Sequence, residues 1–509
     1  MSNTKPQTMR LHQRDNVILA LSNLEQGTVL SADGPVCAQD IPMGHKIAAK
    51  RIKADTPVRK YGQVIGAALH AIEAGQHVHT HNLGMAQLLA NYSIGGESRP
   101  TDYVSQQNRA NFLGYMRPDG QIATRNYIGV LATVGCSASV ARLITDAFRE
   151  DDLRKYPNVD GVVPVVHGLG CGMNFQGEGL AYLQRTLAGF SHNPNFAGLL
   201  LVGLGCETNN LDCLLGNTDI IPGPMLQTLN IQDAGGSRQT IARGMEIVRE
   251  MLAKADKARR QPVPASNLIL GLECGGSDGC SGITANPALG AAADLVVRNG
   301  GTVILSETPE IYGAEHLLLA RAANPRVGQK LLDKIDWWRE YVTRNQGEMN
   351  NNPSPGNKVG GLTTILEKSL GAVAKAGSTD LMEVYDFAEP VTAKGMVFMD
   401  TPGYDLISIT GMIAGGANMI CFTTGRGSVL GSKPAPTIKL ASNTQIYRRL
   451  IDDMDIDCGL IVDGTATVKE MGQAIFDTIL QTASGRKTKS EVMDLGDCEF
   501  VPWPLGAIM

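Results

Sequence analysis

The stretch NLILGLECGGSDGCSGITANPALGAAADLVVRNGGTVILSETPE (residues 267–310) contains one complete unit of an α/β fold. An apolar run ends in a loop of Gly, Ser and Asp, a helix-like segment follows, and a second apolar run ends at SETPE. Short runs rich in Leu, Ile and Val are typical of strands buried on both faces. Strands that alternate with helices predict a mostly parallel sheet.

Three earlier apolar runs end, like this one, in a cysteine that glycine accompanies. They read YIGVLATVGCSAS, VVPVVHGLGCGMN and LLLVGLGCETNN, and with Cys274 they place four cysteines at strand ends: Cys136, Cys171, Cys206 and Cys274. In an open α/β sheet the loops after the strands converge on one crevice, where ligands bind. The repeated pattern therefore predicts an enzyme whose site is built from several loops.

The alternation of strands and helices also predicts the domain organisation. Short strands between turn signals indicate a small β-rich domain at residues 1–90, and residues 91–111 have the composition of a linker. We expect one α/β domain at 112–262 and a C-terminal α/β domain at 263–509, separated by the polar segment KADKARRQPVPASN. The predicted fold is thus α/β, with a small β-rich N-terminal domain and two mostly parallel sheets.

The composition excludes several classes of protein. At 509 residues with 43% hydrophobic and 19% charged residues, the chain has the profile of a multidomain globular protein. The net charge of −5 and the absence of a basic stripe argue against a nucleic-acid partner. No apolar run reaches the roughly 18 residues of a membrane helix, and no secretory signal is visible, so we expect a cytoplasmic protein without a membrane partner.

Three histidines alternate in HVHTHN (residues 77–82). Alternate residues of a strand share one face, so His77, His79 and His81 would point the same way. Imidazole suits Fe, Zn, Ni or Cu, and His45 in PMGHKIA could complete such a site. The alternative is a polar strand edge that binds nothing.

The four strand-end cysteines permit a second kind of metal site. Iron–sulfur clusters need three or four cysteine thiolates, and inert buried thiols are the alternative. Because compact CxxC spacing is absent, a mononuclear metal is favoured over an iron–sulfur cluster.

Polar residues in the glycine loops are the remaining site candidates. Glu273, Ser277 and Asp278 lie in ECGGSDG before a helix, whose N-terminus can bind an anion. Lys358 and Arg426 stand in glycine-rich loops, as carboxylate clamps or as solvated charges.

Three further candidates belong to the first α/β repeat. His167 precedes the Cys171 turn and could transfer protons, although a single histidine there is more often structural. Arg125 and Asn126 enter the first strand of the repeat.

Taken together, these motifs resemble the hexonate and hexarate dehydratases typified by altronate and galactarate dehydratase. The resemblance covers nearly the full length and rests on GHKIA, KYGQVIG, HVHTHN, RPDGQIATRNY, HGLGCG, ECGGSDGCSGITANP, ETPEIYGAEHLL, NPSPGNKVGG and FTTGRGS. HVHTHN and the ECGGSDG loop are closer to the altronate branch. The N-terminal part resembles the family's SAF domain. The (R)-sulfolactate sulfo-lyases are also similar, but there the small and large parts are usually separate chains.

The resemblance implies elimination of water from an aldonate or aldarate, giving a 2-keto-3-deoxy acid. It implies a divalent metal, most often Fe²⁺ with Mn²⁺ or Zn²⁺ as alternatives, and its motifs carry the ligands over to His45, His79 and His81. We expect catalytic roles for His167, Glu273, Asp278 and Lys358, and substrate contacts from Arg125, Asn126, Ser277 and Arg426. A single site requires the histidine domain to dock over the α/β crevice. A C–S lyase acting on sulfolactate and a non-catalytic sugar-acid binding protein are the alternatives. The expected partner is a small sugar acid, and assembly with a second copy of the chain is left open.

Overall fold

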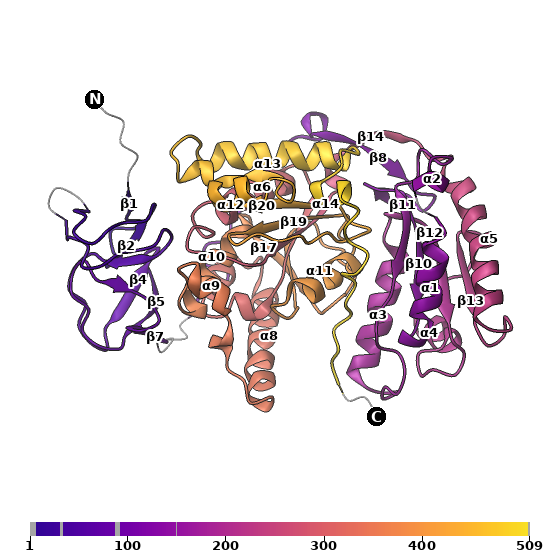
Figure 1. The fold of residues 1–509 in the computed structure, drawn as a ribbon, viewed down its shortest axis with the longest axis horizontal. Coiled ribbons are helices and arrows are strands. Elements are labelled where there is room, and N and C mark those ends of the chain that lie inside the picture. The colour runs from indigo at the N-terminus through magenta and orange to yellow at the C-terminus, as the bar shows by residue number, and fades with distance from the viewer. Residues whose placement is uncertain (1–6, 31–33, 87–91, 149, 507–509) are drawn as a thin grey trace.

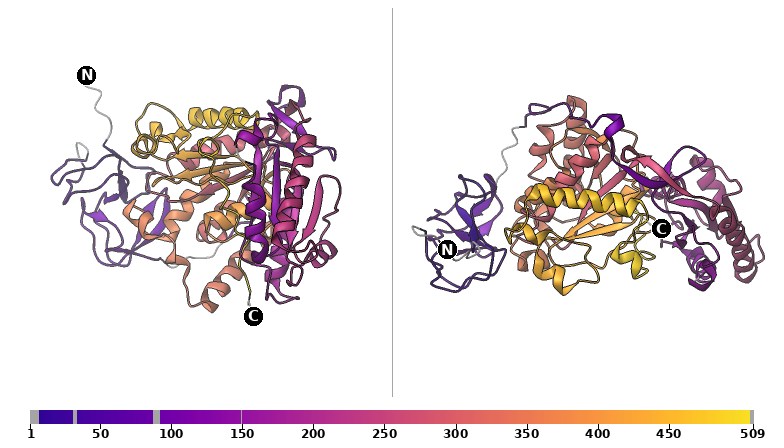
Figure 2. Two further views of the ribbon diagram at one scale, coloured as in Figure 1. Left: turned by 45° about the vertical axis from the view of Figure 1, so that its right-hand side comes forward. Right: turned by 90° about the horizontal axis from the view of Figure 1, so that it is seen from above.

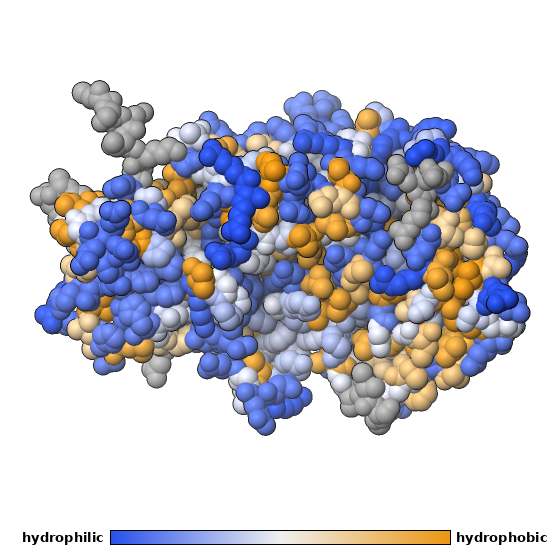
Figure 3. All heavy atoms as spheres, viewed as in Figure 1, coloured by the Kyte–Doolittle hydropathy of each residue, from blue (hydrophilic) through white to orange (hydrophobic). Residues whose placement is uncertain are grey.

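The computed structural model describes residues 7–30, 34–86, 92–148 and 150–506, which form three units in a row (Figures 1 and 2). The small N-terminal unit lies at one end, the C-terminal α/β unit is in the middle, and the other α/β unit is at the far end. On the face seen in Figure 3, hydrophilic residues dominate the N-terminal unit and hydrophobic ones gather over the unit at the right. Among the described helices, none is both long and apolar enough to cross a membrane.

The N-terminal unit is β-rich, as the sequence predicts. One sheet has the order β1-β2-β3-β6 and the other β4-β5-β7, with bounds Thr8–Met9, Val17–Ala20, Lys46–Ala48 and His77–Val78, then Pro57–Lys60, Gln63–Ala68 and Leu83–Gly84. β3 and β6 run antiparallel with Ile47 opposite His77. Because of this register, the residue that precedes β3 lies beside the histidine strand.

The next unit contains a parallel sheet of order β11-β10-β12-β13. Its strands are β10 (Tyr127–Ala132), β11 (Gly161–Val165), β12 (Phe196–Gly203) and β13 (Leu226–Asn230). Helices α1 (Ala138–Thr145) and α5 (Ser237–Ala255) cover one face, and α3 (Glu178–His192) covers the other, while α2 (Glu150–Leu153) and α4 (Leu211–Asn217) are short. A Cβ on Gly189 of α3 would lie 2.2 Å from the Ala414 carbonyl oxygen, so α3 packs closely against the C-terminal unit.

The C-terminal unit has a seven-stranded parallel sheet of order β17-β18-β16-β15-β19-β20-β21. Its strands are β15 (Ile269–Cys274), β16 (Thr302–Leu305), β17 (Leu381–Tyr385), β18 (Gly395–Met399), β19 (Met419–Thr424), β20 (Thr437–Ala441) and β21 (Ile456–Asp457). The chain continues from β15 to β16 on one side and later returns to β19 on the other. The loops after β15 and β19 therefore diverge, which creates the switch-point crevice of α/β sheets.

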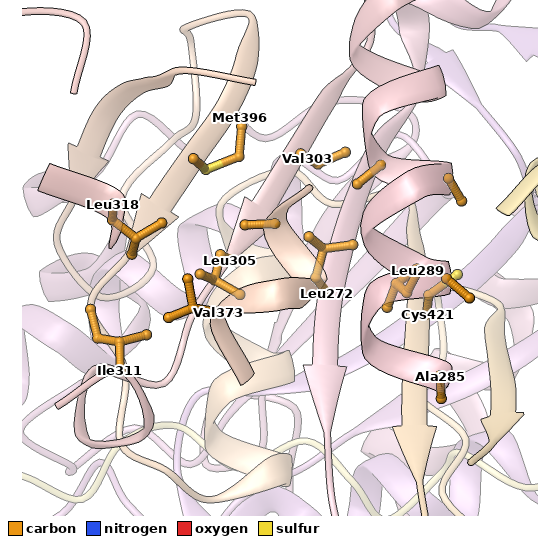
Figure 4. Packing of buried hydrophobic residues seen from close by; sticks show 14 of the residues in the cluster. Leu272, Ala285, Leu289, Val303, Leu305, Ile311, Leu318, Val373, Met396 and Cys421 are labelled. Carbon is orange, nitrogen blue, oxygen red and sulfur yellow. The ribbon is translucent and has the colours of Figure 1, made fainter. Parts of the chain in front are cut away.

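Helices complete the layers of this unit. They are α6 (Ala285–Arg298), α7 (Glu315–Leu319), α8 (Pro325–Arg344), α9 (Pro355–Val359), α10 (Ile365–Val373), α11 (Asp405–Ala414), α12 (Thr444–Arg449), α13 (Val468–Ala483) and α14 (Lys489–Val492). In the core, Leu272 and Cys421 of the sheet lie beside Leu289 of α6 (Figure 4). Both faces of the sheet are covered, which explains why its strands are continuous apolar runs.

A small antiparallel sheet of order β14-β8-β9 connects the two α/β units. β8 (Asn111–Met116) carries the chain into the unit that contains β10, and β14 (Arg260–Pro264) carries it back, while β9 is Ile122–Ala123. Residues 112 and 262, the expected ends of that unit, pair within one residue of each other in these two strands. The preceding segment runs along the C-terminal unit, where the Val104 amide donates to the Arg298 carbonyl at 2.7 Å.

Candidate functional site

Three histidines converge at the edge of the N-terminal unit that faces the C-terminal unit. Ligand atoms of His45, His77 and His79 lie within 4.8 Å of one another, and His45 Nδ1 is 2.9 Å from His77 Nε2. His45 Nε2 is 3.0 Å from the Val359 carbonyl oxygen, to which it donates. This hydrogen bond leaves the lone pair on Nδ1, which faces the other two rings.

The chemistry of this group fits a divalent transition metal. His79 Nδ1 is buried and has no hydrogen-bond partner among the described residues. Burial, followed by the neighbouring histidines, lowers the pKa of His77 to about 3, and burial, followed by Lys46, lowers that of His79 to about 4. The imidazoles are therefore neutral at physiological pH, as metal ligation requires.

The structure differs from the predicted histidine set, which was His45, His79 and His81. Strand β6 ends at Val78, and residues 79–82 form a turn in which the Asn82 amide donates to the His79 carbonyl at 2.9 Å. His81 is exposed and outside the tight group of ligand atoms, which contains His77 instead, but its ring centroid lies 5.5 Å from that of His77.

The histidine unit docks on the C-terminal unit, as a single site requires. A Cβ on Gly279 would lie 1.9 Å from the Gly44 carbonyl oxygen, so the two backbones touch. Glu367 on α10 is fully buried between Lys46 and Lys60, at 2.8 and 3.0 Å. Two buried ion pairs therefore fix the histidine strands against the crevice of the C-terminal unit.

A cavity of about 210 Å³ lies at this contact, over the switch point of the sheet. Its walls come from the N-terminal unit, from the loops after β15 and β19, and from α9 and α12, and they include Met43, Asp278, Gly360, Arg426, Asn443 and Arg449. Arg426 and Arg449 are exposed, and neither side chain forms a hydrogen bond or ion pair within the described ranges. The cavity therefore offers two unpaired guanidinium groups to an anion.

The ECGGSDG loop contributes Ser277 and Asp278 to this region. Ser277 Oγ is buried without a partner among the described residues. Asp278 Oδ1 accepts hydrogen bonds from the amides of Cys280 and Ser281 and from the hydroxyls of Ser281 and Ser442, and Oδ2 accepts one from Asn443 at 3.0 Å. These contacts hold Asp278 as an acceptor that orders the cavity wall.

Lys358 and Glu273 lie at different depths. Lys358 is half-buried on α9 beside Val359 and Gly360, which line the cavity. Glu273 is fully buried, accepts a hydrogen bond from Ser408 at 2.6 Å, and belongs to a deeper group at the ends of β15 and β16. The deeper group consists of Glu273, Cys274, Glu307, Glu310, Lys368, Lys375 and Asp405.

Negative charge exceeds positive charge in the deeper group, which has four carboxyl groups and two lysines. Burial raises the pKa of Glu273 to about 7, and burial, followed by Glu273 and Glu310, raises that of Glu307. Glu307 has a left-handed backbone with φ of 69°, and its Oε1 has no partner within the described residues. A proton held between carboxyl groups relieves this excess of charge.

Three predicted residues lie elsewhere. His167 is buried and both ring nitrogens are engaged, Nε2 with the Ala132 carbonyl at 2.9 Å and Nδ1 with the Leu169 amide at 3.1 Å. Burial lowers the pKa of His167 to about 4. A histidine held in this way supports the loop after β11, so we do not retain it for proton transfer.

Arg125 and Asn126 are likewise parts of the framework. Arg125 is 1% exposed, forms a bidentate pair with Glu491 at 2.6 and 2.8 Å, and donates to backbone carbonyls such as Thr482. Asn126 is fully buried and donates to the Asn158 carbonyl at 2.7 Å. Neither side chain reaches the cavity, and we do not retain either for substrate binding.

The four strand-end cysteines separate into two places. Cys274 is buried in the deeper group of the C-terminal unit, with Sγ 3.5 Å from Glu310 Oε2. Cys136, Cys171 and Cys206 are exposed in the unit that contains β10. Cys274 thus belongs to a different sheet from the other three, which the common sequence pattern did not reveal.

Sequence reasoning missed Arg449, Asn443 and the ion pairs of Glu367. Arg449 and Asn443 are on or beside a short helix without a motif. Glu367 and its two lysines are separated by more than 300 residues, and a charge in a helical segment carries no sign of burial. Lys60 and Lys46, however, lie in KYGQ and GHK, two of the motifs that carry the family resemblance.

Comparison with known proteins agrees with this architecture. Three domain families match: the altronate/galactarate dehydratase SAF domain at residues 6–86, the second domain of D-galactarate dehydratase/altronate hydrolase at 114–256, and the C-terminal domain of D-galactarate/altronate dehydratase at 265–508.

Relatives that align with most of the chain are named as dehydratases or as a sulfo-lyase. Galactarate dehydratase (L-threo-forming) of Escherichia coli is 37% identical over 94% of this chain and 93% of its own. Altronate dehydratase of Bacillus subtilis is 34% identical over 96% and 97%. The (2R)-sulfolactate sulfo-lyase subunit beta of Chromohalobacter salexigens is 32% identical over 77% and 96%. The chain belongs to the altronate/galactarate dehydratase family of hydro-lyases.

Proposed function

We propose that the protein eliminates water from an altronate-like aldonate or aldarate and gives a 2-keto-3-deoxy acid. The observation that carries the proposal is the junction at Val359, whose carbonyl accepts the His45 hydrogen bond while the residue lines the cavity with Arg426. A metal-ligating group and a cation-lined cavity thus share one wall. This combination suits a substrate with a carboxylate and several hydroxyls.

Arg426 and Arg449 are the groups we assign to the substrate carboxylate. Guanidinium binds carboxylate bidentately, and neither side chain has another partner in the described part of the chain. Ser277 Oγ, which is buried without a partner among the described residues, is suited to a substrate hydroxyl. Asn443 instead supports the wall, because its side-chain amide donates to Asp278 and to the Gly425 carbonyl. Asp278 keeps these groups in place through its hydrogen bonds to the surrounding loops.

A divalent metal, most often Fe²⁺ with Mn²⁺ or Zn²⁺ as alternatives, would be held by His45, His77 and His79. When bound, it supplies stabilisation of the negative charge that develops as the α-proton leaves. The hydrogen bond from His45 Nε2 to the Val359 carbonyl keeps the His45 tautomer that has its lone pair on Nδ1. The ion pair of Lys46 with Glu367 keeps the histidines beside the cavity.

Lys358 is the group we assign to proton transfer. Lys358 is half-buried on α9, whose last residue Val359 and C-cap Gly360 line the cavity wall. Transfer of the α-carbon proton to the lysine amine, breaking of the C3–oxygen bond and return of that proton to the departing hydroxyl give an enol and water, and the enol tautomerises to the ketone. Lys358→Arg should lower kcat and shift its pH profile, whereas an exposed control, Lys469→Arg, should leave both unchanged.

A C–S lyase acting on sulfolactate is a second candidate because of the relative named sulfo-lyase subunit beta. It uses the same α-proton abstraction, with sulfite as the leaving group. The test is a panel of aldonates, aldarates and sulfolactate with anaerobically purified protein of known metal content. A 2-keto-3-deoxy acid supports the dehydratase, sulfite supports the lyase, and turnover of neither would refute both.

A further inference from the structure

Three exposed thiols lie at the carboxyl edge of the sheet in the unit that contains β10. Cys171 follows β11, Cys136 follows β10, and Cys206 follows β12. These strands are neighbours in the order β11-β10-β12, and all run parallel. The topology thus brings three cysteines from distant parts of the sequence to adjacent loops, and the proposed dehydration uses none of them.

Backbone hydrogen bonds connect the three loops to one another. The Gly135 amide donates to the Leu169 carbonyl at 2.8 Å, which joins the Cys136 loop to the Cys171 loop. The Asn209 amide donates to the Gly170 carbonyl at 3.0 Å, which joins the Cys171 loop to the Cys206 loop. The residues next to each thiol are therefore fixed relative to the others.

Buried polar side chains support the same loops. Glu207 accepts hydrogen bonds from the amides of Leu204 and Gly205 at 2.9 and 2.6 Å and from Thr133 Oγ1 at 3.0 Å. Asn209 Nδ2 donates to the Thr133 carbonyl at 2.9 Å. The carboxylate and amide thus hold the backbone on both sides of Cys206, as supporting groups do around metal ligands.

Backbone geometry explains why glycines stand beside these cysteines. Gly170 and Gly172, which flank Cys171, have φ of 102° and 63°, and Gly205 before Cys206 has φ of 129°. These left-handed conformations favour glycine. A Cβ on Gly170 would lie 2.6 Å from the Thr133 carbonyl oxygen, so only glycine permits the loops to approach so closely.

We propose that Cys136, Cys171 and Cys206 bind an iron–sulfur cluster through three thiolates. Two thiolates on one tetrahedral ion would be about 3.8 Å apart, given a metal–sulfur bond of about 2.3 Å. Within the described ranges, the groups whose ligand atoms lie within 4.8 Å of one another do not include these thiols. A cluster separates its thiolates by its own iron and sulfide atoms, which suits three linked but separated loops.

The cluster site is distinct from the histidine site. The unit that carries it is at the opposite end of the molecule from the histidine unit (Figures 1 and 2). Cys274 is buried in the C-terminal unit and is not a fourth ligand. A four-iron cluster held by three cysteines leaves one iron without a protein thiolate, and the exposure of all three cysteines opens that iron to water or a small anion.

The experiment is anaerobic reconstitution of the full chain with ferrous iron and sulfide, followed by iron and acid-labile sulfide analysis and Mössbauer spectroscopy. Three single variants, Cys136→Ser, Cys171→Ser and Cys206→Ser, are compared with two controls, Cys213→Ser and Cys498→Ser, whose thiols lie outside the three loops. Thermal unfolding of each protein identifies any variant that fails to fold. His77→Ala tests independence from the histidine site.

We expect acid-labile sulfide and a cluster signature in the unaltered chain, in both controls and in His77→Ala. Each of the three loop variants should lose most of the sulfide while it unfolds at a similar temperature. Three results would overturn the proposal: no bound sulfide in the unaltered chain, zinc bound in place of iron and sulfide, or full sulfide retention in the folded loop variants. None of these results bears on sugar-acid turnover, so the two proposals fail separately.

Discussion

Replacement of Glu367 by Gln should weaken the attachment of the histidine unit. The carboxylate is buried between Lys46 and Lys60 and also accepts hydrogen bonds from the Thr363 amide and hydroxyl. Burial alone would raise the pKa of Glu367, but the two lysines outweigh it and lower the pKa to about 2 from an ordinary 4.5. At about 1.36 kcal/mol per pKa unit, that difference corresponds to roughly 3 kcal/mol.

A second argument gives a similar magnitude. Removal of one partner from a buried ion pair costs roughly 3–5 kcal/mol, because the remaining charge stays buried without compensation. Burial lowers the pKa of Lys46 to about 8 even with Glu367 present. Without the carboxylate, Lys46 would lose its proton near neutral pH, so the cost should lie toward the lower end of this range.

Hydrogen exchange of β3 and β6 measures this effect locally, which avoids the assumption of two-state unfolding in a multidomain chain. A loss of about 3 kcal/mol corresponds to at least a hundredfold faster exchange through opening of that unit. The control Glu73→Gln removes an ion pair with Arg51 that is more than half exposed, and it should change stability by less than about 1 kcal/mol. Exchange in Glu367→Gln within threefold of the unaltered chain would refute the reasoning.

Three other predictions concern the site and its support. His77→Ala should lose the bound divalent metal and turnover, measured by metal analysis and kinetics, whereas the exposed His70→Ala should keep both; retained metal would contradict the histidine set. Arg426→Gln should raise KM roughly 10- to 100-fold, the equivalent of about 1.4–2.8 kcal/mol, and Arg344→Gln should not; an unchanged KM would remove Arg426 from the substrate site. The pKa of His167 falls from 6.5 in an unfolded chain to about 4 on folding, so the folded state binds fewer protons between these values. The free energy of opening of the unit that contains β10 should therefore drop by about 3 kcal/mol as pH falls from 6.5 to 4, and His167→Asn should flatten that slope in hydrogen exchange of β10 and β11; an equal slope in both proteins would contradict this.

The fold class was predictable because the hydrophobic pattern reflects burial directly. The run of residues 267–310 became β15, α6 and β16 in that order, since a strand covered on both faces must be apolar throughout. The position of Asp278 and Arg426 at the crevice was also predictable, because glycines at strand ends mark the loops that form it.

The rest depends on long-range contacts that no local pattern records. The alternation in HVHTHN predicts that three imidazoles gather, but it does not say which of them lie closest to His45, because that depends on the pairing of β6 with β3. Arg125 and His167 were chosen as chemical groups, but their partners, Glu491 and the Ala132 carbonyl, come from packing that is remote in sequence or across the sheet. The common Gly–Cys pattern concealed that Cys274 belongs to another sheet.

The paired strands β8 and β14 have a consequence for how the chain can vary. Residues 117 to 259 leave and re-enter the C-terminal unit at adjacent positions, because Tyr115 pairs directly with Arg260. The ends of the intervening unit are therefore held together by the pairing of β8 with β14, whatever the length of the unit. Insertions or deletions inside it need not change the spacing of β8 and β14. The contact between the N-terminal unit and the C-terminal unit therefore does not depend on them. Selection can thus reshape one end of the molecule while the other end keeps its geometry.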